Sequence, residues 1–140
     1  MQEVLLAPVP RHHIAAARDI ARRAGGRVAF GTGANDPGKM WEFFSTKVHS
    51  GMQVLLHVSA TGEGEHHGAV FSHRAIFDRI VAGEREVSYL RPESTADDTG
   101  YQLFWVARDF EELAKADWVS FARVKITPPL DGPLVKHLHL

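Results

Sequence analysis

Residues 51–59 form the most regular alternation in the chain, and a stretch rich in glycine follows them directly. In an extended conformation one side of this segment is apolar, and the other side carries Leu55, His57 and Ser59. The glycines suit a hairpin tip, after which residues 68–71 can return as a second strand. The pattern therefore predicts a β-hairpin near the middle of the chain.

The rest of the chain predicts short elements separated mostly by turns. Further strands are predicted at residues 2–7, 27–30, 85–90, 101–107 and 118–126. Helices are predicted at residues 11–24 and from the Asp36-Pro37 pair onward, with short helical pieces at 72–81 and 109–115. Because strands outnumber helices, we expect an α+β fold with a mixed or antiparallel sheet that curls toward a barrel, and not a doubly wound parallel sheet.

Length and composition indicate one domain. The chain has 140 residues, and we expect residues 1–126 to form a single domain followed by an extended, proline-containing tail at 127–140. The absence of cysteine excludes disulfides, thiolate zinc sites and cysteine nucleophiles, and it fits a reducing compartment. No stretch is apolar for long enough to span a membrane, and the N-terminal residues do not resemble a secretory signal. We therefore expect a cytoplasmic protein without a membrane partner.

The charge pattern indicates a local basic face on a nearly neutral protein. The formal net charge is −1, whereas proteins that coat DNA through its phosphates are clearly basic. On the first predicted helix, Arg11, Arg18 and Arg22 lie close together beside the apolar stripe, and Arg27 and Arg74 could extend this face. The candidates for phosphate contacts are Arg11, Arg18, Arg22 and Arg74. The alternative is an ordinary solvated face, partly balanced by Asp19.

Five segments, in this order, resemble the EVE-type branch of the PUA-like superfamily: residues 28–31, 39–41, 51–57, 68–71 and 101–106. The resemblance consists of a strand that ends in an aromatic-glycine pair, a helical turn with a central tryptophan, and a glycine-headed barrel strand with its returning hairpin. Met52 stands where the family usually has aspartate, and His57 stands near an expected aromatic residue. The Gly-x-Lys-x-x-x-Arg motif of the related ASCH domains is absent.

The resemblance implies a PUA-like barrel of five to six strands with short flanking helices. It also implies a nucleic-acid-binding module, with DNA favoured over RNA, that reads a modified base, for example a methylated one, as in modification-dependent restriction. The partner would then include an effector nuclease, fused or encoded nearby. No cofactor is implied.

A base reader holds a base that has left the stack between aromatic faces and reads its edge with polar groups. The residues expected to form such a pocket at the mouth of the barrel are Phe30, Thr32, Asn35, Trp41, His57, Ser59 and Trp105. Phe43 and Phe44 are further candidates for stacking. The alternative for most of these aromatic residues is a place in the core.

Other chemistry has weaker support in the sequence. The nine histidines include the pairs His12-His13 and His66-His67 and the His137-x-His139 spacing, but none is combined with a carboxylate in a metal-site pattern. No nucleophile or phosphate-loop motif is present, although His57 with a glutamate of the hairpin tip could perform acid–base work. We therefore expect no catalytic and no metal-binding residues. The alternatives are a small ASCH-like hydrolase or nucleotide-processing enzyme, and a protein–protein adaptor that uses the apolar residues near Trp41.

Overall fold

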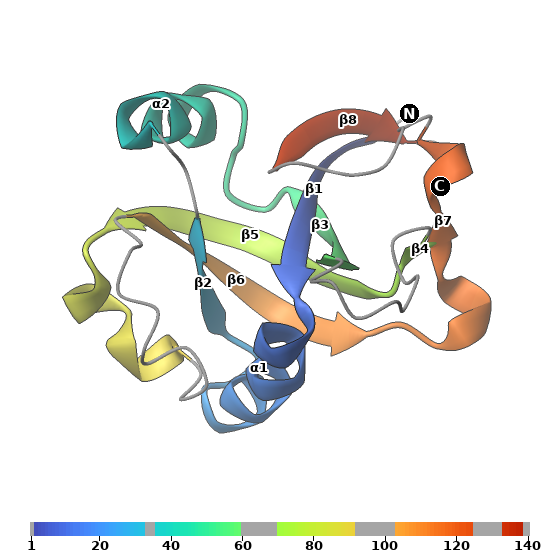
Figure 1. Cartoon of the computed structure of the whole chain (residues 1–140), viewed down its shortest axis with the longest axis horizontal. Coiled ribbons are helices and arrows are strands. Elements are labelled where there is room, and N and C mark those ends of the chain that lie inside the picture. The colour runs from blue at the N-terminus through green and yellow to red at the C-terminus, as the bar shows by residue number, and fades with distance from the viewer. Residues whose placement is uncertain (1, 33–35, 60–69, 92–102, 125–132, 139–140) are drawn as a thin grey trace.

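The structure is a computed structural model that describes residues 2–32, 36–59, 70–91, 103–124 and 133–138. Two α-helices and a mixed six-stranded sheet form an α+β fold, as expected from the sequence (Figure 1). The strands of the sheet, in spatial order, are β2 (Val28–Thr32), β6 (Leu103–Glu112), β5 (His73–Ala82), β3 (Gln53–Ser59), β1 (Gln2–Pro10) and β8 (Leu134–Leu138). The short strands β4 (Val70–Phe71) and β7 (Val119–Ser120) pair with each other in a separate sheet.

The six-stranded sheet is mostly antiparallel. Among the described strands only β1 and β3 pair in parallel, whereas β3 with β5, β5 with β6, β6 with β2 and β1 with β8 are antiparallel. The expectation of a mixed sheet that is not doubly wound is therefore confirmed. Within the described residues β2 and β8 are the two edges and do not pair with each other, so the sheet is open and the expected closure into a barrel is not seen.

The first helix and its end follow directly from the sequence. Helix α1 (Arg11–Arg23) buries the apolar stripe that contains Ile14, Ala17 and Ile20. After Ala24 the chain turns through Gly25 and Gly26, whose φ angles of 65° and 88° lie in the left-handed region that glycine tolerates best.

The second helix begins at a side-chain cap. Helix α2 (Pro37–Thr46) follows Asp36, whose carboxylate accepts a hydrogen bond from the Lys39 amide at 3.1 Å. Pro37 occupies the first turn, where a missing amide hydrogen has no cost. Neither of the described helices is long and apolar enough to cross a membrane.

The helix predicted at residues 72–81 is wrong, because this segment is the long strand β5. Its buried residues include His73, Ala75 and Phe77 on one face. Two register shifts against β6, between Arg74 and Ile76 and between Phe77 and Arg79, interrupt the simple alternation. These irregularities place apolar residues at a spacing that resembles a helical period.

Three further segments differ from the expectation. Residues 85–90 form two 3-10 helices, η1 (Glu84–Glu86) and η2 (Ser88–Leu90), in place of a strand, because Val87 and Leu90 are both buried, three residues apart. Residues 109–112 continue β6, and only η4 (Lys115–Asp117) is helical. The strand predicted at 118–126 is reduced to β7, after which the Ser120 hydroxyl caps the 3-10 helix η5 (Phe121–Arg123).

Strand pairing also differs from the expectation for the predicted hairpin and for the C-terminal tail. The strand that returns beside β3 is β5, whereas β4 pairs with β7 and comprises Val70 and Phe71, the described part of the predicted 68–71 strand. Residues 134–138 of the expected tail form the edge strand β8 against β1.

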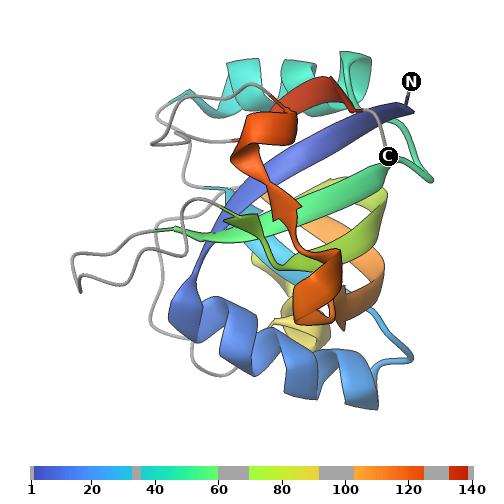
Figure 2. The ribbon, with the colours of Figure 1, turned by 90° about the vertical axis from the view of Figure 1, so that its right-hand side faces the viewer.

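Both faces of the sheet are buried. The main core cluster lies between the sheet and the two helices, which cover opposite ends of the curled sheet (Figure 2). Phe30 and Trp105 belong to this cluster, with ring centroids 4.8 Å apart. On the other face, the segments that carry β4, β7 and η5 cover β1 and β3 with a second cluster: Val4, Leu6, Leu55, Phe71, Val119, Phe121 and Val124. A third cluster packs Val87 and Leu90, at η2, against β2, β5 and β6.

The two tryptophans considered for a base pocket differ in burial, and this predicts different costs of truncation. Trp105 is 3% exposed and Trp41 is 42% exposed. Trp105→Ala is expected to lower the free energy of unfolding by about 3 to 5 kcal/mol, whereas Trp41→Ala is expected to cost about 1 kcal/mol or less. Chemical denaturation of both variants measures the difference. Equal losses would contradict the assignment of Trp105 to the core.

Candidate functional site

The residues expected to form one base pocket lie in separate places. Phe30 and Trp105 are core residues, and Thr32 is buried with its hydroxyl 3.5 Å from the Leu103 carbonyl. Trp41 is exposed on α2. Phe44 is in the main core cluster and Phe43 packs against it. The structure therefore provides no shared stacking surface for these aromatic residues.

His57 lies on the opposite face of the sheet from Phe30. It is 4% exposed, and its ring packs edge-on against Phe71 and Phe121 of the second cluster, at centroid distances of 5.7 and 5.1 Å. Asn35 lies outside the described residues. Ser59 ends β3, but its side chain is not among those described.

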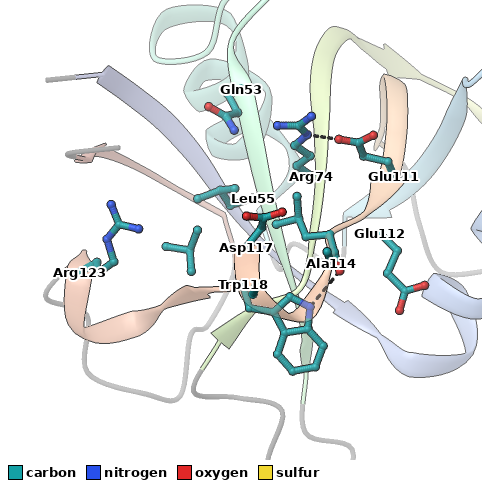
Figure 3. Close-up of a pocket in the computed structure, with 12 residues that line it drawn as sticks. Gln53, Leu55, Arg74, Glu111, Glu112, Ala114, Asp117, Trp118 and Arg123 are labelled. Carbon is teal, nitrogen blue, oxygen red and sulfur yellow. Dashed lines mark hydrogen bonds and ion pairs between the residues drawn. The ribbon is translucent and has the colours of Figure 1, made fainter.

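A different site is present on the outer face of the sheet (Figure 3). It is an open hollow of about 570 Å³. Gln53 and Leu55 of β3, Arg74 of β5 and Glu111 of β6 contribute to it from three neighbouring strands. The segment from Leu113 to Arg123 forms its remaining wall.

The strand register explains why these side chains meet. Arg74 lies opposite Leu55 on one neighbour and opposite Glu111 on the other, so the three residues form a row across the sheet. Gln53 lies two residues before Leu55 and therefore points to the same face. The row of Leu55, Arg74 and Glu111 is thus determined by the pairing of β5 with β3 and with β6, which are distant in the sequence.

The wall of the hollow is held by local hydrogen bonds. The Leu113 amide donates to the Ser72 carbonyl at 2.9 Å, and the Asp117 amide donates to the Ala114 carbonyl at 2.7 Å. The Trp118 indole N–H donates to the Leu113 carbonyl at 3.1 Å, which fixes the orientation of its ring. The wall is therefore held in place by the chain's own contacts.

Two of the arginines expected to contact phosphate are paired with consecutive glutamates of β6. Glu111 accepts a close hydrogen bond from Arg74 Nε, and Glu112 accepts one from Arg18 of α1. Consecutive residues of a strand point to opposite faces, so one glutamate reaches β5 on the outer face and the other reaches the helix. The second pair places α1 beside the hollow, because Glu112 also lines it.

The other two arginines lie on the exposed side of α1. Arg22 is 3.9 Å from the Asp19 carboxylate, with both side chains 72% exposed, so this pair contributes little. Arg11 is exposed at the start of the helix. Arg23, which was not considered from the sequence, is exposed beside Arg22.

The hollow carries both signs of charge. Glu111 and Asp117 line it together with Arg74 and Arg123, and Glu112 borders it with its carboxylate paired to Arg18 of α1. The Asp117 carboxylate lies near the centre of the view in Figure 3 and forms no hydrogen bond or ion pair with the described part of the chain. The hollow therefore presents the Asp117 carboxylate as an available hydrogen-bond acceptor beside two arginines.

A second, smaller hollow of about 380 Å³ adjoins the first. The two share Gln53, Arg74 and Glu111. Gln2 and Asp109 also line the smaller hollow, and Asp109 has a positive φ of 53° at an irregular point of β6. Aspartate tolerates this conformation better than most residues.

Two buried histidines lie near these hollows but line neither. His57 Nδ1 donates to the Val58 carbonyl at 3.2 Å, and its Nε2 has no hydrogen-bond partner in the described structure. Burial lowers the pKa of His57, although the hydrogen bond to Val58 partly opposes this.

His73 is held by a different set of contacts. Its Nδ1 is 2.8 Å from the Ser72 hydroxyl, and its ring stacks on Phe110. Burial lowers the pKa of His73, with Glu112 raising it and Arg18 lowering it further. Because Ser72 and His73 are both buried, this pair has a structural role in anchoring β5.

The described residues contain no group of three histidine, cysteine, aspartate or glutamate side chains that could hold a metal ion. Residues 66, 67 and 139, three of the histidine positions considered from the sequence, lie outside the described ranges. Comparison of the sequence with protein-family models and with curated proteins finds no match.

Arg74 was identified from the sequence, but most of the hollow was not. Gln53, Asp117 and Trp118 were not considered, because they belong to segments that meet only in the folded sheet. The available signal was the charged run from Arg108 to Asp117 directly after an apolar strand. Glu111 and Glu112 in this run have the pattern of ordinary solvent-exposed charges, so the sequence did not distinguish them as site residues.

The lowered pKa values predict a loss of stability in mild acid. In the unfolded chain His57 and His73 regain a pKa of about 6.5. Below that pH the unfolded state binds protons that the folded state does not, so the free energy of unfolding falls as pH decreases from about 7 toward 5. Denaturation curves at several pH values measure this fall.

His57→Phe keeps an aromatic ring against Phe71 and Phe121 and is expected to make the fall smaller. His49→Gln, a change at an exposed histidine, is the matched control and should retain the full dependence. An unchanged pH dependence in the His57→Phe protein would contradict the contribution of His57.

Proposed function

We propose that the chain is a nucleic-acid-binding module that holds one unstacked base in the hollow beside Gln53, with the phosphates of the strand along α1. The observation that carries the proposal is the position of a preformed polar hollow next to a helix with exposed arginines. The Arg18–Glu112 ion pair joins these two surfaces.

The hollow suits a base in size and chemistry. Small-molecule sites commonly have volumes of about 300 to 1,000 Å³, and this hollow has about 570 Å³. Carboxylates such as that of Asp117 accept hydrogen bonds from exocyclic amines, and the Gln53 amide both donates and accepts. Trp118 adds an aromatic wall of fixed orientation.

Charge separates the places for the base and the phosphates. Inside the hollow, the Asp117 carboxylate repels phosphate but accepts hydrogen bonds from the edge of a neutral base. The exposed Arg11, Arg22 and Arg23 of α1 lie outside the hollow and provide the positive charge that phosphates need. The same division explains how a chain with a net charge of −1 could bind nucleic acid.

The resemblance to EVE-type domains supports the finer form of this proposal. An open six-stranded sheet with a helix at either end is compatible with a PUA-like barrel. In this finer proposal, the hollow holds a modified base that is flipped out of DNA, and a partner effector nuclease cuts the modified DNA. The base site lies at the Gln53 hollow and not beside Trp41, since Phe30 and Trp105 are buried.

Replacement of Gln53 tests the position of the base site. Gln53→Leu keeps the approximate size of the side chain and removes both polar groups of the amide, so the affinity for a single-stranded oligonucleotide should fall about 10-fold. Fluorescence anisotropy measures the affinity, and thermal melts confirm that the variant is folded. Trp41→Ala is the control and should bind as the unaltered protein does. The reverse result would place the site on α2, and no binding by the unaltered protein would contradict the proposed function.

The contribution of α1 is tested by a salt series. Binding to single strands should weaken with salt, and removal of one phosphate-binding arginine should reduce the slope of log K against log salt by about 0.7. Arg22→Gln is therefore expected to reduce the slope by about one such step. Arg79→Gln, on β5 and outside both hollows, should leave it unchanged. A slope near zero in the unaltered protein would exclude binding through phosphates.

A further inference from the structure

The two hollows are separated by a single row of side chains. Arg74 and Glu111, which face each other across β5 and β6, line both hollows. The larger hollow extends from this row toward the 113–123 wall, and the smaller one extends the other way, past Ile76 and Asp109. Along a strand, neighbouring rows on the same face are about 7 Å apart.

We infer that the ligand of this surface spans both hollows, and that its minimal unit is a dinucleotide whose internucleotide phosphate lies against Arg74. This inference rests on the proposed function and adds the length and orientation of the bound strand. One base occupies the larger hollow, and the neighbouring base occupies the smaller one.

The guanidinium group of Arg74 has the donors that this arrangement requires. Its Nε is bonded to Glu111, while its two terminal nitrogens have no hydrogen-bond partner in the described part of the chain. In Figure 3 the group lies between Gln53 and Glu111. A planar guanidinium with free terminal N–H groups matches the geometry of a phosphate and can bind two of its oxygens.

The smaller hollow has groups that suit a second base. The amides of Gln2 and Gln53 each provide donors and acceptors, and Ile76 provides an apolar surface. Asp109 adds a carboxylate, held at the irregular point of β6 by the Phe110 amide, which donates to the Gly26 carbonyl at 3.2 Å. No charged group other than Arg74 in this lining favours a phosphate deeper in the hollow.

Glu111 competes with the ligand in this arrangement. Its carboxylate neutralises Arg74 in the free protein and repels an approaching phosphate. Both side chains are about half exposed, at 52% and 47%, so the pair is weak enough for a phosphate to displace the carboxylate. Loss of the Glu111 charge should therefore strengthen binding of a phosphate-containing ligand.

The test compares deoxycytidine with the dinucleoside monophosphate of deoxycytidine, and repeats the comparison with deoxyadenosine, by calorimetry or NMR titration. In the unaltered protein the dinucleotide is expected to bind at least about 10-fold more tightly than the nucleoside, because it adds a charge-assisted contact and a second base. Arg74→Gln should lower this ratio, because it removes the charge-assisted contact and leaves only the contribution of the second base. Glu111→Gln should increase it, and Arg79→Gln is the matched control that should preserve it.

The possible failures are distinct. If the nucleoside binds but the dinucleotide binds no more tightly, the two-hollow inference is wrong and the proposed base site stands. A ratio that Arg74→Gln leaves unchanged in a folded protein also overturns the inference. If neither nucleosides nor dinucleotides nor longer oligonucleotides bind, the proposed function itself is wrong.

Discussion

Burial of both faces of β3 is the constraint on which the rest of the structure depends. Val54 and Leu56 face the main cluster and Leu55 faces the second one, so the outer face of the sheet needs its own cover. That cover is supplied by β4, β7 and η5, and it is small. The hollow is the part of the outer face beyond this cover, where the strands carry Gln53 and Arg74 in place of large apolar residues.

The sequence predicts the elements that are regular and local, and it fails where pairing overrides a local pattern. Helix α1, capped helix α2 and strand β3 were predicted correctly because an apolar period, an N-cap or a plain alternation marks each of them. Strand β5 was not, since its irregular pairing with β6 breaks the alternation. Residues 118–126 are apolar enough for a strand, but the Ser120 cap turns the chain after two residues.

The candidate site was predictable only in part for the same physical reason. Arg74 was identified as a single basic residue, but its partner Glu111 is known only from the β5–β6 register. The glutamates of β6 give Arg18 and Arg74 a structural role. Their ion pairs connect β6 to α1 and to β5, and a ligand would have to compete with them. In the proposed function, the hollow and the exposed arginines of α1 divide the reading of a base from the attraction of a backbone, a division that a net charge of −1 does not reveal.

The wall of the hollow and the cover of the second cluster are one continuous segment, and this joins stability to recognition. Trp118 and Arg123 line the hollow, while Val119 and Phe121 between them are buried in the cluster against Leu55 and Phe71. Each of these lining side chains is thus close in the sequence to one that is buried in the core. Residues supported in this way keep their positions without a ligand, so binding costs little ordering of the wall. The packing of the second cluster, including the buried His57 ring, consequently determines the shape of the site.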